Sequence, residues 1–256
     1  MSGGQAPRHA LVTGGSRGIG AAIVRRLAAE GHHVTVLGRG LQAAQALAAQ
    51  DPGHLHAVAA DVADAAQMTA ALADARARFG PITVLVNNAG QAESAPFLKM
   101  DIDLWQRMLH VNLTGTMVCT QAVLPDMLAA GWGRIVNVAS TAGRKGYAYV
   151  SAYCAAKHGV IGLTRSLALE LAAKGVTVNA VCPGYTDTDI VRTSVERVAA
   201  KTGRSAQSAR NEFTKVNPQG RLVDPDEVAD AVVWLCGTRA AAVTGQAVSV
   251  SGGEVM

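Results

Sequence analysis

The chain of 256 residues has few aromatic side chains, which make up 4% of it, whereas alanine, valine, leucine and glycine are abundant. Small and branched aliphatic residues suit helices that pack closely on a buried parallel sheet. The hydrophobic content of 49% can fill one large core, and α/β folds build chains of this length as one domain. We therefore expect a single domain that spans residues 1–256.

The sequence also lacks runs of like charge, because its net charge of +4 comes from scattered residues. This distribution predicts a solvated surface with room for an anionic small ligand, and it does not indicate nucleic-acid binding. The four cysteines, Cys119, Cys154, Cys182 and Cys236, form no CxxC pair and lie in apolar runs. Reduced thiols in the core are therefore expected, with neither a disulfide framework nor a metal site.

No apolar run reaches the roughly 20 residues that a membrane-spanning helix requires. Residues 1–7 form a short polar leader without the apolar core of a signal peptide. The sequence therefore predicts a cytoplasmic protein that has no membrane partner.

Short apolar runs alternate with segments of helical composition along most of the chain. Helix starts are indicated by a capping Asp64 and by Asp224-Pro225, where Glu227 can reach back to the cap. Because crossovers between parallel strands are right-handed, the alternation predicts a doubly wound parallel sheet with helices on both faces. The predicted strands cover residues 9–13, 33–37, 55–60, 82–86, 134–139, 176–182 and 247–250.

Residues 186–221 interrupt this alternation. The interval is polar, basic and only weakly helical, and its one apolar stripe consists of Val191, Val195 and Val198. Long excursions from a compact domain often cover a binding site, so the interval is predicted to be a substrate lid.

A glycine-rich turn, with the sequence Gly14-x-x-x-Gly18-x-Gly20, follows the first predicted strand and precedes a helix. Backbone N–H groups and the helix dipole can hold a phosphate at such a turn. The spacing differs from the usual GxGxxG, so its position in the chain is better evidence for nucleotide binding than its letters. A merely tight turn is the alternative interpretation.

The second predicted strand ends at Gly38 and Arg39, where an acidic residue would hold the ribose hydroxyl of NAD(H). Arg17, in the glycine-rich turn, could close on the same group from the other side. Two cations at this place predict a 2′-phosphate and therefore NADP(H), with NAD(H) as the alternative cofactor. The competing explanation is that both arginines are ordinary surface charges.

Tyr153 and Lys157 are four residues apart in a predicted helix and therefore lie on the same helical face. A nearby cation lowers the pKa of a phenol from its usual value of about 10, so Tyr153 could exchange a proton near neutral pH. Taken alone, the spacing is also what any alanine-rich helix produces by coincidence.

The chain resembles the short-chain dehydrogenase/reductase family over residues 9–253. The resemblance is carried by the glycine-rich turn, Asn88-Ala89-Gly90, Ser140, the Tyr153-x-x-x-Lys157 pair and Pro183-Gly184, all in this order. It implies a Rossmann-type sheet of about seven strands, a nicotinamide cofactor and a homotetramer assembled through two long central helices.

The resemblance further implies a catalytic set of Asn112, Ser140, Tyr153 and Lys157. Ser140 would hydrogen-bond the substrate oxygen, and Tyr153 would give that oxygen its proton as hydride arrives from the nicotinamide. Lys157 would lower the pKa of Tyr153 and hold the nicotinamide ribose. Asn112 would bend its helix and carry a water that links Lys157 to solvent, and purely structural bonds are its alternative role.

Cofactor contacts are implied in the same way for each part of the dinucleotide. They are Thr13, Gly14, Ser16, Arg17, Gly18, Ile19 and Gly20 for the pyrophosphate region, Arg39 for the 2′-phosphate, Asp61 and Val62 for adenine, Asn88, Ala89, Gly90, Tyr153 and Lys157 near the ribose, and Pro183, Gly184, Thr186 and Thr188 for the carboxamide.

Within the family, the 3-oxoacyl-thioester reductases are most similar, through residues 136–143 and Arg39. In the fatty-acid enzymes a basic residue three positions before the one that matches Arg134 docks the acyl carrier protein, and this chain has Gly131 there. That difference favours a CoA thioester or a free ketone. The chain also has Thr141-Ala142 where 3-hydroxybutyrate dehydrogenases have a histidine after the catalytic serine.

The leading hypothesis is therefore an NADPH-dependent reductase of 3-oxoacyl thioesters. One alternative is a secondary-alcohol dehydrogenase for aryl, alicyclic or steroid-like ketones, and another is a cofactor-sensing protein without turnover, against which the intact catalytic set argues. Arg144-Lys145 could contact a phosphate or carboxylate of the substrate, or form a solvated loop. The residues expected to line the substrate pocket are Ala92, Glu93, Ser94, Thr141, Arg144, Tyr147, Tyr149, Tyr185 and Val191.

Overall fold

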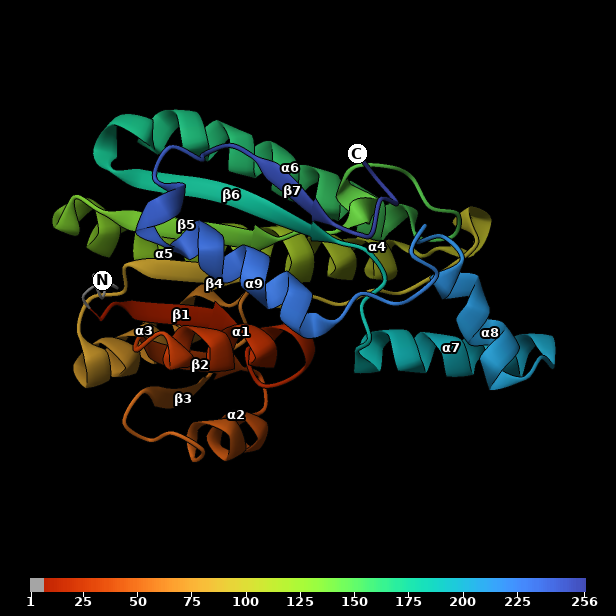
Figure 1. Ribbon diagram of the computed structural model, residues 1–256, viewed down its shortest axis with the longest axis horizontal. Coiled ribbons are helices and arrows are strands. Elements are labelled where there is room, and N and C mark those ends of the chain that lie inside the picture. The colour runs from red at the N-terminus through yellow and green to blue at the C-terminus, as the bar shows by residue number, and fades with distance from the viewer. Residues whose placement is uncertain (1–6) are drawn as a thin grey trace.

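Seven parallel strands form one twisted sheet in the order β3-β2-β1-β4-β5-β6-β7 (Figure 1). The computed structural model describes residues 7–256, so residues 1–6 of the predicted polar leader lie outside the described residues. The sheet confirms the predicted fold, a doubly wound Rossmann-type domain. Its strands are β1 (His9–Thr13), β2 (His33–Gly38), β3 (Leu55–Ala59), β4 (Val84–Asn87), β5 (Gly133–Val138), β6 (Val176–Pro183) and β7 (Ala247–Val250).

Helices cover both faces of the sheet (Figure 1). Alternate side chains of each strand point to opposite faces, so in β1 Ala10 and Val12 join one core cluster while Leu11 joins the other. The first cluster is completed by α1 (Gly18–Ala29), α2 (Leu41–Ala48) and α9 (Pro225–Cys236), and the second by α3 (Ala65–Phe79), α5 (Gly115–Ala130) and α6 (Ser151–Leu171).

The predicted helix caps are present. Asp64 accepts hydrogen bonds from the backbone N–H groups of Ala66 and Gln67, at 2.9 and 3.0 Å, and so begins α3. Asp224 and Glu227 form a reciprocal capping box at the start of α9. Both signals are local in sequence, which is why they could be identified without the fold.

The helical region predicted over residues 101–130 consists of three consecutive parts. These are α4 (Ile102–Leu109), a five-residue π-helix (His110–Thr114) and α5. A π-helical turn widens the helix and exposes backbone groups, and such turns occur frequently at functional sites. Asn112 lies in the middle of this turn.

The expectation that residues 186–221 are only weakly helical is wrong. The interval contains α7 (Asp189–Thr202) and α8 (Ala206–Thr214), which lie beyond the ends of the strands in Figure 1. The two helices share a small apolar core. In it, Val191 and Val195 of the predicted stripe pack on Ala209 and Phe213. A stripe this narrow is sufficient because each helix has a partner to cover it.

All four cysteines are buried as free thiols, in agreement with the apolar runs that contain them. Within residues 7–256, no helix combines the length and apolar character required to cross a membrane.

A buried histidine begins β1 at the amino end of the sheet. The His9 ring is 4% exposed, with Nδ1 2.7 Å from the carbonyl oxygen of Gly80 and Nε2 2.9 Å from the Thr35 hydroxyl. The Phe79 ring lies edge-on to it, with ring centroids 5.6 Å apart. Burial lowers the pKa of His9 from 6.5 to about 4.

This low pKa predicts a loss of stability in mild acid. The unfolded chain takes up a proton at His9 below pH 6.5, whereas the native chain takes it up only near pH 4. His9 should therefore lower the free energy of unfolding by about 2 kcal/mol between pH 7.5 and pH 5. Urea unfolding at both pH values measures the loss, which His9→Gln should reduce and which the exposed control His158→Gln should leave in place. Equal pH dependence in both variants would contradict the assignment.

Candidate active site

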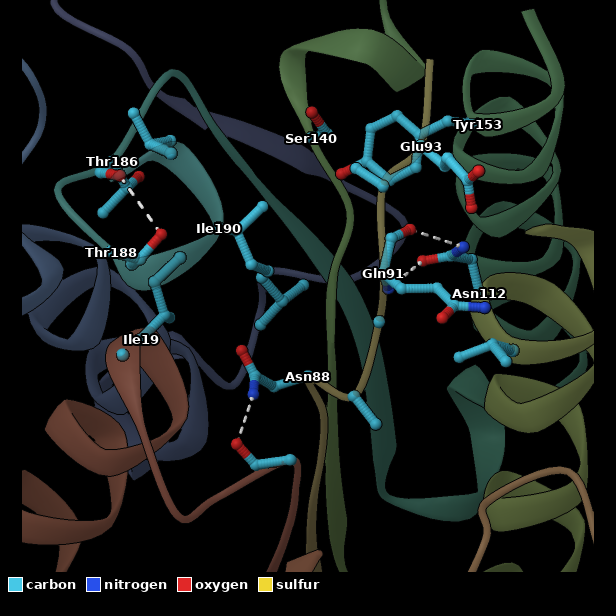
Figure 2. Close-up of a pocket in the computed structure, with 18 of the residues that line it drawn as sticks. Ile19, Asn88, Gln91, Glu93, Asn112, Ser140, Tyr153, Thr186, Thr188 and Ile190 are labelled. Atoms are coloured by element: carbon cyan, nitrogen blue, oxygen red, sulfur yellow. Dashed lines mark hydrogen bonds between the residues drawn. The ribbon is translucent and has the colours of Figure 1, made fainter. Parts of the chain in front are cut away.

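A cavity of about 880 Å³ extends along the carboxyl ends of the central strands (Figure 2). It lies at the point where the chain order of the strands reverses, since β1 is flanked by β2 on one side and by β4 on the other. Ligands of doubly wound sheets bind at such a switch point. The residues at this edge therefore determine what the chain can bind.

The glycine-rich turn forms one wall of the cavity. Gly14 has a φ of +62°, and a Cβ atom at Gly20 would lie 2.2 Å from the carbonyl oxygen of Gly14. Side chains are thus excluded where the turn folds back on itself. The Gly15 N–H donates to the Leu37 carbonyl oxygen at 3.1 Å, and the N-terminus of α1 that follows is a place where an anion can bind.

Thr13 and Asn88 hold this turn from behind. The Thr13 hydroxyl accepts hydrogen bonds from the backbone N–H groups of Asn88 and Ala89, both at 3.0 Å. The Asn88 amide in turn donates to the carbonyl oxygens of Thr13 and Gly14, at 3.0 and 3.1 Å (Figure 2). Thr13 was predicted to contact the pyrophosphate, but it is 1% exposed and supports the turn instead of lining the cavity.

The other predicted cofactor positions line the cavity. Arg17 and Arg39 are both exposed at one end of it, and neither forms an ion pair with any residue from 7 to 256. The remaining lining positions are Gly14, Ser16, Gly18, Ile19, Gly20, Asp61, Val62, Asn88, Ala89, Gly90, Tyr153, Lys157, Pro183, Gly184, Thr186 and Thr188.

Ser140, Tyr153 and Lys157 meet at the centre of the cavity. Ser140 follows β5, and Figure 2 shows it beside the Tyr153 ring of α6. Lys157 lies one helical turn further along, with Nζ 5.7 Å from the centroid of the Tyr153 ring. The buried ammonium donates a hydrogen bond to the carbonyl oxygen of Val138 at 2.9 Å, which fixes its position below the phenol.

The pKa expected for Tyr153 requires a correction. Burial raises the pKa of this phenol to about 12, and the neighbouring Ser140 hydroxyl opposes the rise. Burial also lowers the pKa of Lys157 to about 8. Burial is thus the largest influence on the pKa of Tyr153, and the lowering is due to Ser140 and not to Lys157, on which the prediction depended. Tyr153 is a protonated phenol at neutral pH and can serve as a proton donor.

Asn112 connects the π-helix to the chain segment that leaves β4. Its amide donates hydrogen bonds to the carbonyl oxygens of Gln91 and Met108, at 3.0 and 2.9 Å, and its side-chain oxygen accepts from the Gln91 N–H at 3.2 Å (Figure 2). Both N–H donors of the side chain are thus engaged in structural bonds, whereas its oxygen has room for one more donor and Asn112 lines the cavity. The π-turn at this position agrees with the implied distortion of the helix.

A second network of buried amides lies beneath the site and was not predicted. The Asn87 amide donates to Thr120 at 3.0 Å and to the side-chain oxygen of Asn137 at 2.9 Å. Asn137 then donates to the Thr164 hydroxyl at 2.9 Å. The network joins β4, β5, α5 and α6, and an asparagine within the apolar run of residues 135–138 is the signal that could have revealed it.

The substrate side of the cavity agrees with the predicted lining except at Arg144. Arg144 turns away and donates to the carbonyl oxygens of Ala247 and Met256, at 2.8 and 3.1 Å, and to the Ser249 hydroxyl at 2.9 Å. Arg144 therefore holds the end of the chain and does not line the cavity, while its side chain stays exposed, as in the solvated loop that was the alternative. Lining residues are Ala92, Glu93, Ser94, Thr141, Tyr147, Tyr149, Tyr185 and Val191.

Glu254 supports this side of the cavity from the C-terminal tail. Its side chain is 1% exposed, forms an ion pair with Lys145 at 3.1 Å and is hydrogen-bonded to the Tyr147 hydroxyl. The Tyr147 hydroxyl also lies 2.7 Å from that of Thr141. Burial, and next the contact with Glu254, raise the pKa of Tyr147. No motif marks Glu254, because its partners are more than 100 residues away in the sequence.

Comparisons with known proteins identify the family. The family model for short chain dehydrogenases matches residues 8–199. An acetoacetyl-CoA reductase of Shinella zoogloeoides is 41% identical over 247 residues, which are 96% of this chain and 98% of the relative. A cis-4-hydroxycyclohexanecarboxylate dehydrogenase of Sinomonas cyclohexanicum is 43% identical over 252 residues, which are 97% of this chain and 96% of the relative.

A solved structure has the same fold throughout. The crystal structure of a variant of actinorhodin polyketide ketoreductase with NADPH matches with a TM-score of 0.93 and 40% identity, covering 97% of both chains. The chain therefore belongs to the short-chain dehydrogenase family. It is accordingly an oxidoreductase that acts on CH–OH groups, as the sequence indicated.

The contacts of Glu254 predict a measurable effect on stability. Glu254→Gln keeps an acceptor for Tyr147 but removes the charge that pairs with Lys145, so it should lower the free energy of unfolding by about 1 kcal/mol. Hydrogen–deuterium exchange of residues 251–256 should become faster. Glu212→Gln is the matched control, because its partner Lys215 is exposed and such pairs contribute only about 0–1 kcal/mol. Unchanged exchange in the tail would contradict the proposed support.

Proposed function

We propose that the chain is an NADPH-dependent reductase of 3-oxoacyl thioesters, acting on CoA esters in preference to carrier-protein esters. The observation that carries the proposal is the arrangement of one cavity, with Ser140 and the protonated Tyr153 at its centre and two unpaired arginines, Arg17 and Arg39, at one end. A proton donor beside a hydroxyl suits the reduction of a carbonyl group.

The cavity wall fits an NADP(H) molecule. The Gly14–Gly20 turn leaves space where side chains would obstruct a pyrophosphate, and the two arginines suit a 2′-phosphate because neither forms an ion pair with a described carboxylate. In the family role, Asp61 and Val62 hold the adenine, and Lys157 holds the nicotinamide ribose. When bound there, the nicotinamide supplies the hydride.

The side chains at the centre have complementary tasks. The Ser140 hydroxyl holds the substrate oxygen, and the Tyr153 phenol delivers a proton to it. Lys157, a buried cation 5.7 Å from the ring centroid, stabilises the negative charge that develops on the phenol as the proton leaves. Asn112 keeps the Gln91 backbone in place beside them, and in the family role its region carries a water that reaches Lys157.

The thioester is the favoured substrate for two reasons. The relative from Shinella zoogloeoides acts, by its name, on acetoacetyl-CoA. Gly131 closes α5 in a left-handed conformation, with a φ of +61°, and offers no basic side chain for a carrier protein. The second candidate is the dehydrogenation of an alicyclic secondary alcohol, because the relative from Sinomonas cyclohexanicum carries that activity in its name at 43% identity.

Two further features belong to the same proposal. Residues 186–221, which we call the lid, place Ile190 and Val191 of α7 on the cavity wall and would cover the substrate. The chain would assemble as a homotetramer through α5 and α6, whose outer surfaces expose Met117, Leu128 and Leu169.

The role of Tyr153 can be tested by removing its hydroxyl. Tyr153→Phe should lower kcat for ketone reduction by about 100- to 10,000-fold, the range for a lost general acid. The thermal midpoint and the NADPH dissociation constant report whether fold and cofactor site are intact. Acetoacetyl-CoA and 4-oxocyclohexanecarboxylate, each with NADPH, serve as substrates for the two candidate functions. Substantial residual turnover would contradict the role of Tyr153.

The cofactor preference can be tested at Arg39. Arg39→Asp should lower kcat/KM for NADPH by about 100-fold, because it replaces a charge-assisted hydrogen bond by repulsion between anions. The preference should shift towards NADH. Arg78→Asp is the control. Arg78 lies on α3, away from the cavity, and donates a hydrogen bond to the carbonyl oxygen of Pro52. A preference for NADH that Arg39→Asp leaves unchanged would refute NADPH as the cofactor.

A further inference from the structure

Four of the five arginines in the lid are bound to carboxylates. Arg204 contacts Glu212 at 3.3 Å, Arg221 contacts Glu227 at 2.7 Å, and Arg192 and Arg210 both contact Asp187, at 3.3 and 3.0 Å. These pairs hold α7 and α8 to each other and to the chain around them. Their charges are neutralised within the protein.

Arg197 is the exception among the lid arginines. It forms no ion pair or hydrogen bond with the residues that the structure describes, and it is also the lid arginine that lines the large cavity. It lies one turn from Ser194 and two turns from Ile190, which line the cavity as well. These spacings place Arg197 on the same face of α7 as both residues, and its side chain is exposed to solvent.

Arg197 lies further along α7 than Ile190, and therefore further from the reacting centre at Tyr153. Ile190 extends into the cavity in Figure 2, and a rise of 1.5 Å per residue places the Arg197 backbone about 10 Å further along the helix. A group that Arg197 binds is therefore remote from the carbonyl that Tyr153 protonates.

Among residues 7–256, no carboxylate lies within ion-pair distance of Arg197. Val198, Tyr185 and Phe213 form an apolar wall there, with the two aromatic rings 4.9 Å apart and edge to face. Glu93, the carboxylate on the substrate side of the cavity, is engaged by Arg107 at 3.0 Å. Arg197 is exposed, so its guanidinium remains accessible to an anionic group of a ligand that enters the cavity.

We propose that Arg197 binds an anionic group, a phosphate or a carboxylate, at the end of the substrate remote from its carbonyl. The inference rests on the proposed ketone reductase and defines its substrate further, as an anionic oxo compound. A guanidinium group presents a planar pair of donors that matches both oxyanions. A phosphate would come from CoA, and a carboxylate from a free oxo acid.

The test compares two pairs of substrates. The members of each pair share the same oxo group, and only one member carries an anionic group. One pair is acetoacetyl-CoA and the N-acetylcysteamine thioester of acetoacetate, and the other is 4-oxocyclohexanecarboxylate and its methyl ester. Isothermal titration calorimetry on the enzyme with bound NADP+ gives the dissociation constants, so the measurement does not require turnover. The ratio of neutral to charged dissociation constants expresses the contribution of the anion.

Arg197→Met should lower this ratio about tenfold for one of the two pairs, the loss expected for one charge-assisted hydrogen bond. Arg197→Lys should retain most of it. Arg204→Met is the matched control on the same lid, because Arg204 binds Glu212 and does not line the cavity. A change in the CoA pair identifies a phosphate, and a change in the second pair identifies a carboxylate.

Unchanged ratios in both pairs would overturn the inference, whatever the turnover. The proposed function fails separately, if the wild-type enzyme with NADPH reduces none of the four substrates. An Arg197-dependent ratio without turnover would thus uphold the anion site and refute the reductase.

Discussion

The four hydrogen bonds between Thr13, Asn88 and their neighbours hold together the two strand ends from which the site is built. Beyond these ends the chain from β1 turns to one face of the sheet and the chain from β4 leaves along the other, so the space between them must be kept open. Each of these four hydrogen bonds contributes about 1 kcal/mol, so together they are strong enough to fix the glycine-rich turn. The shape of the cofactor end therefore depends on the buried Thr13 hydroxyl, which does not line the cavity, and on the Asn88 amide, which does.

The same kind of support continues towards the reacting centre. Asn112 fixes the Gln91 backbone, Asn137 links the sheet to α6 at Thr164, and Val138 holds the Lys157 ammonium by its carbonyl oxygen. Buried polar groups are costly without partners, so each of these contacts favours one arrangement of the strand ends. Residues from separate elements thus share hydrogen bonds around the site.

Signals local in the sequence predicted the helices and strands. Features that depend on contacts between distant residues, or on burial, could not be predicted in this way. The capping residues Asp64 and Asp224 act within four positions, so their helices were foreseeable. Arg144 was misplaced because its partners lie about 100 residues away, at the end of the chain. The pKa of Tyr153 was misjudged because spacing reveals a neighbouring charge but not the loss of water around it.

The distribution of charge divides the cavity into parts with different tasks. Within residues 7–256, Arg17 and Arg39 at one end and Arg197 in the lid form no ion pair, whereas the centre contains a neutral phenol at physiological pH. Cations at the ends can bind anions without touching the reacting atoms, and binding energy from remote groups can serve to orient the substrate for reaction. Substrate affinity and proton transfer thus depend on different residues. A substitution at Arg197 should change the affinity for an anionic substrate, and one at Tyr153 should change the rate of carbonyl reduction.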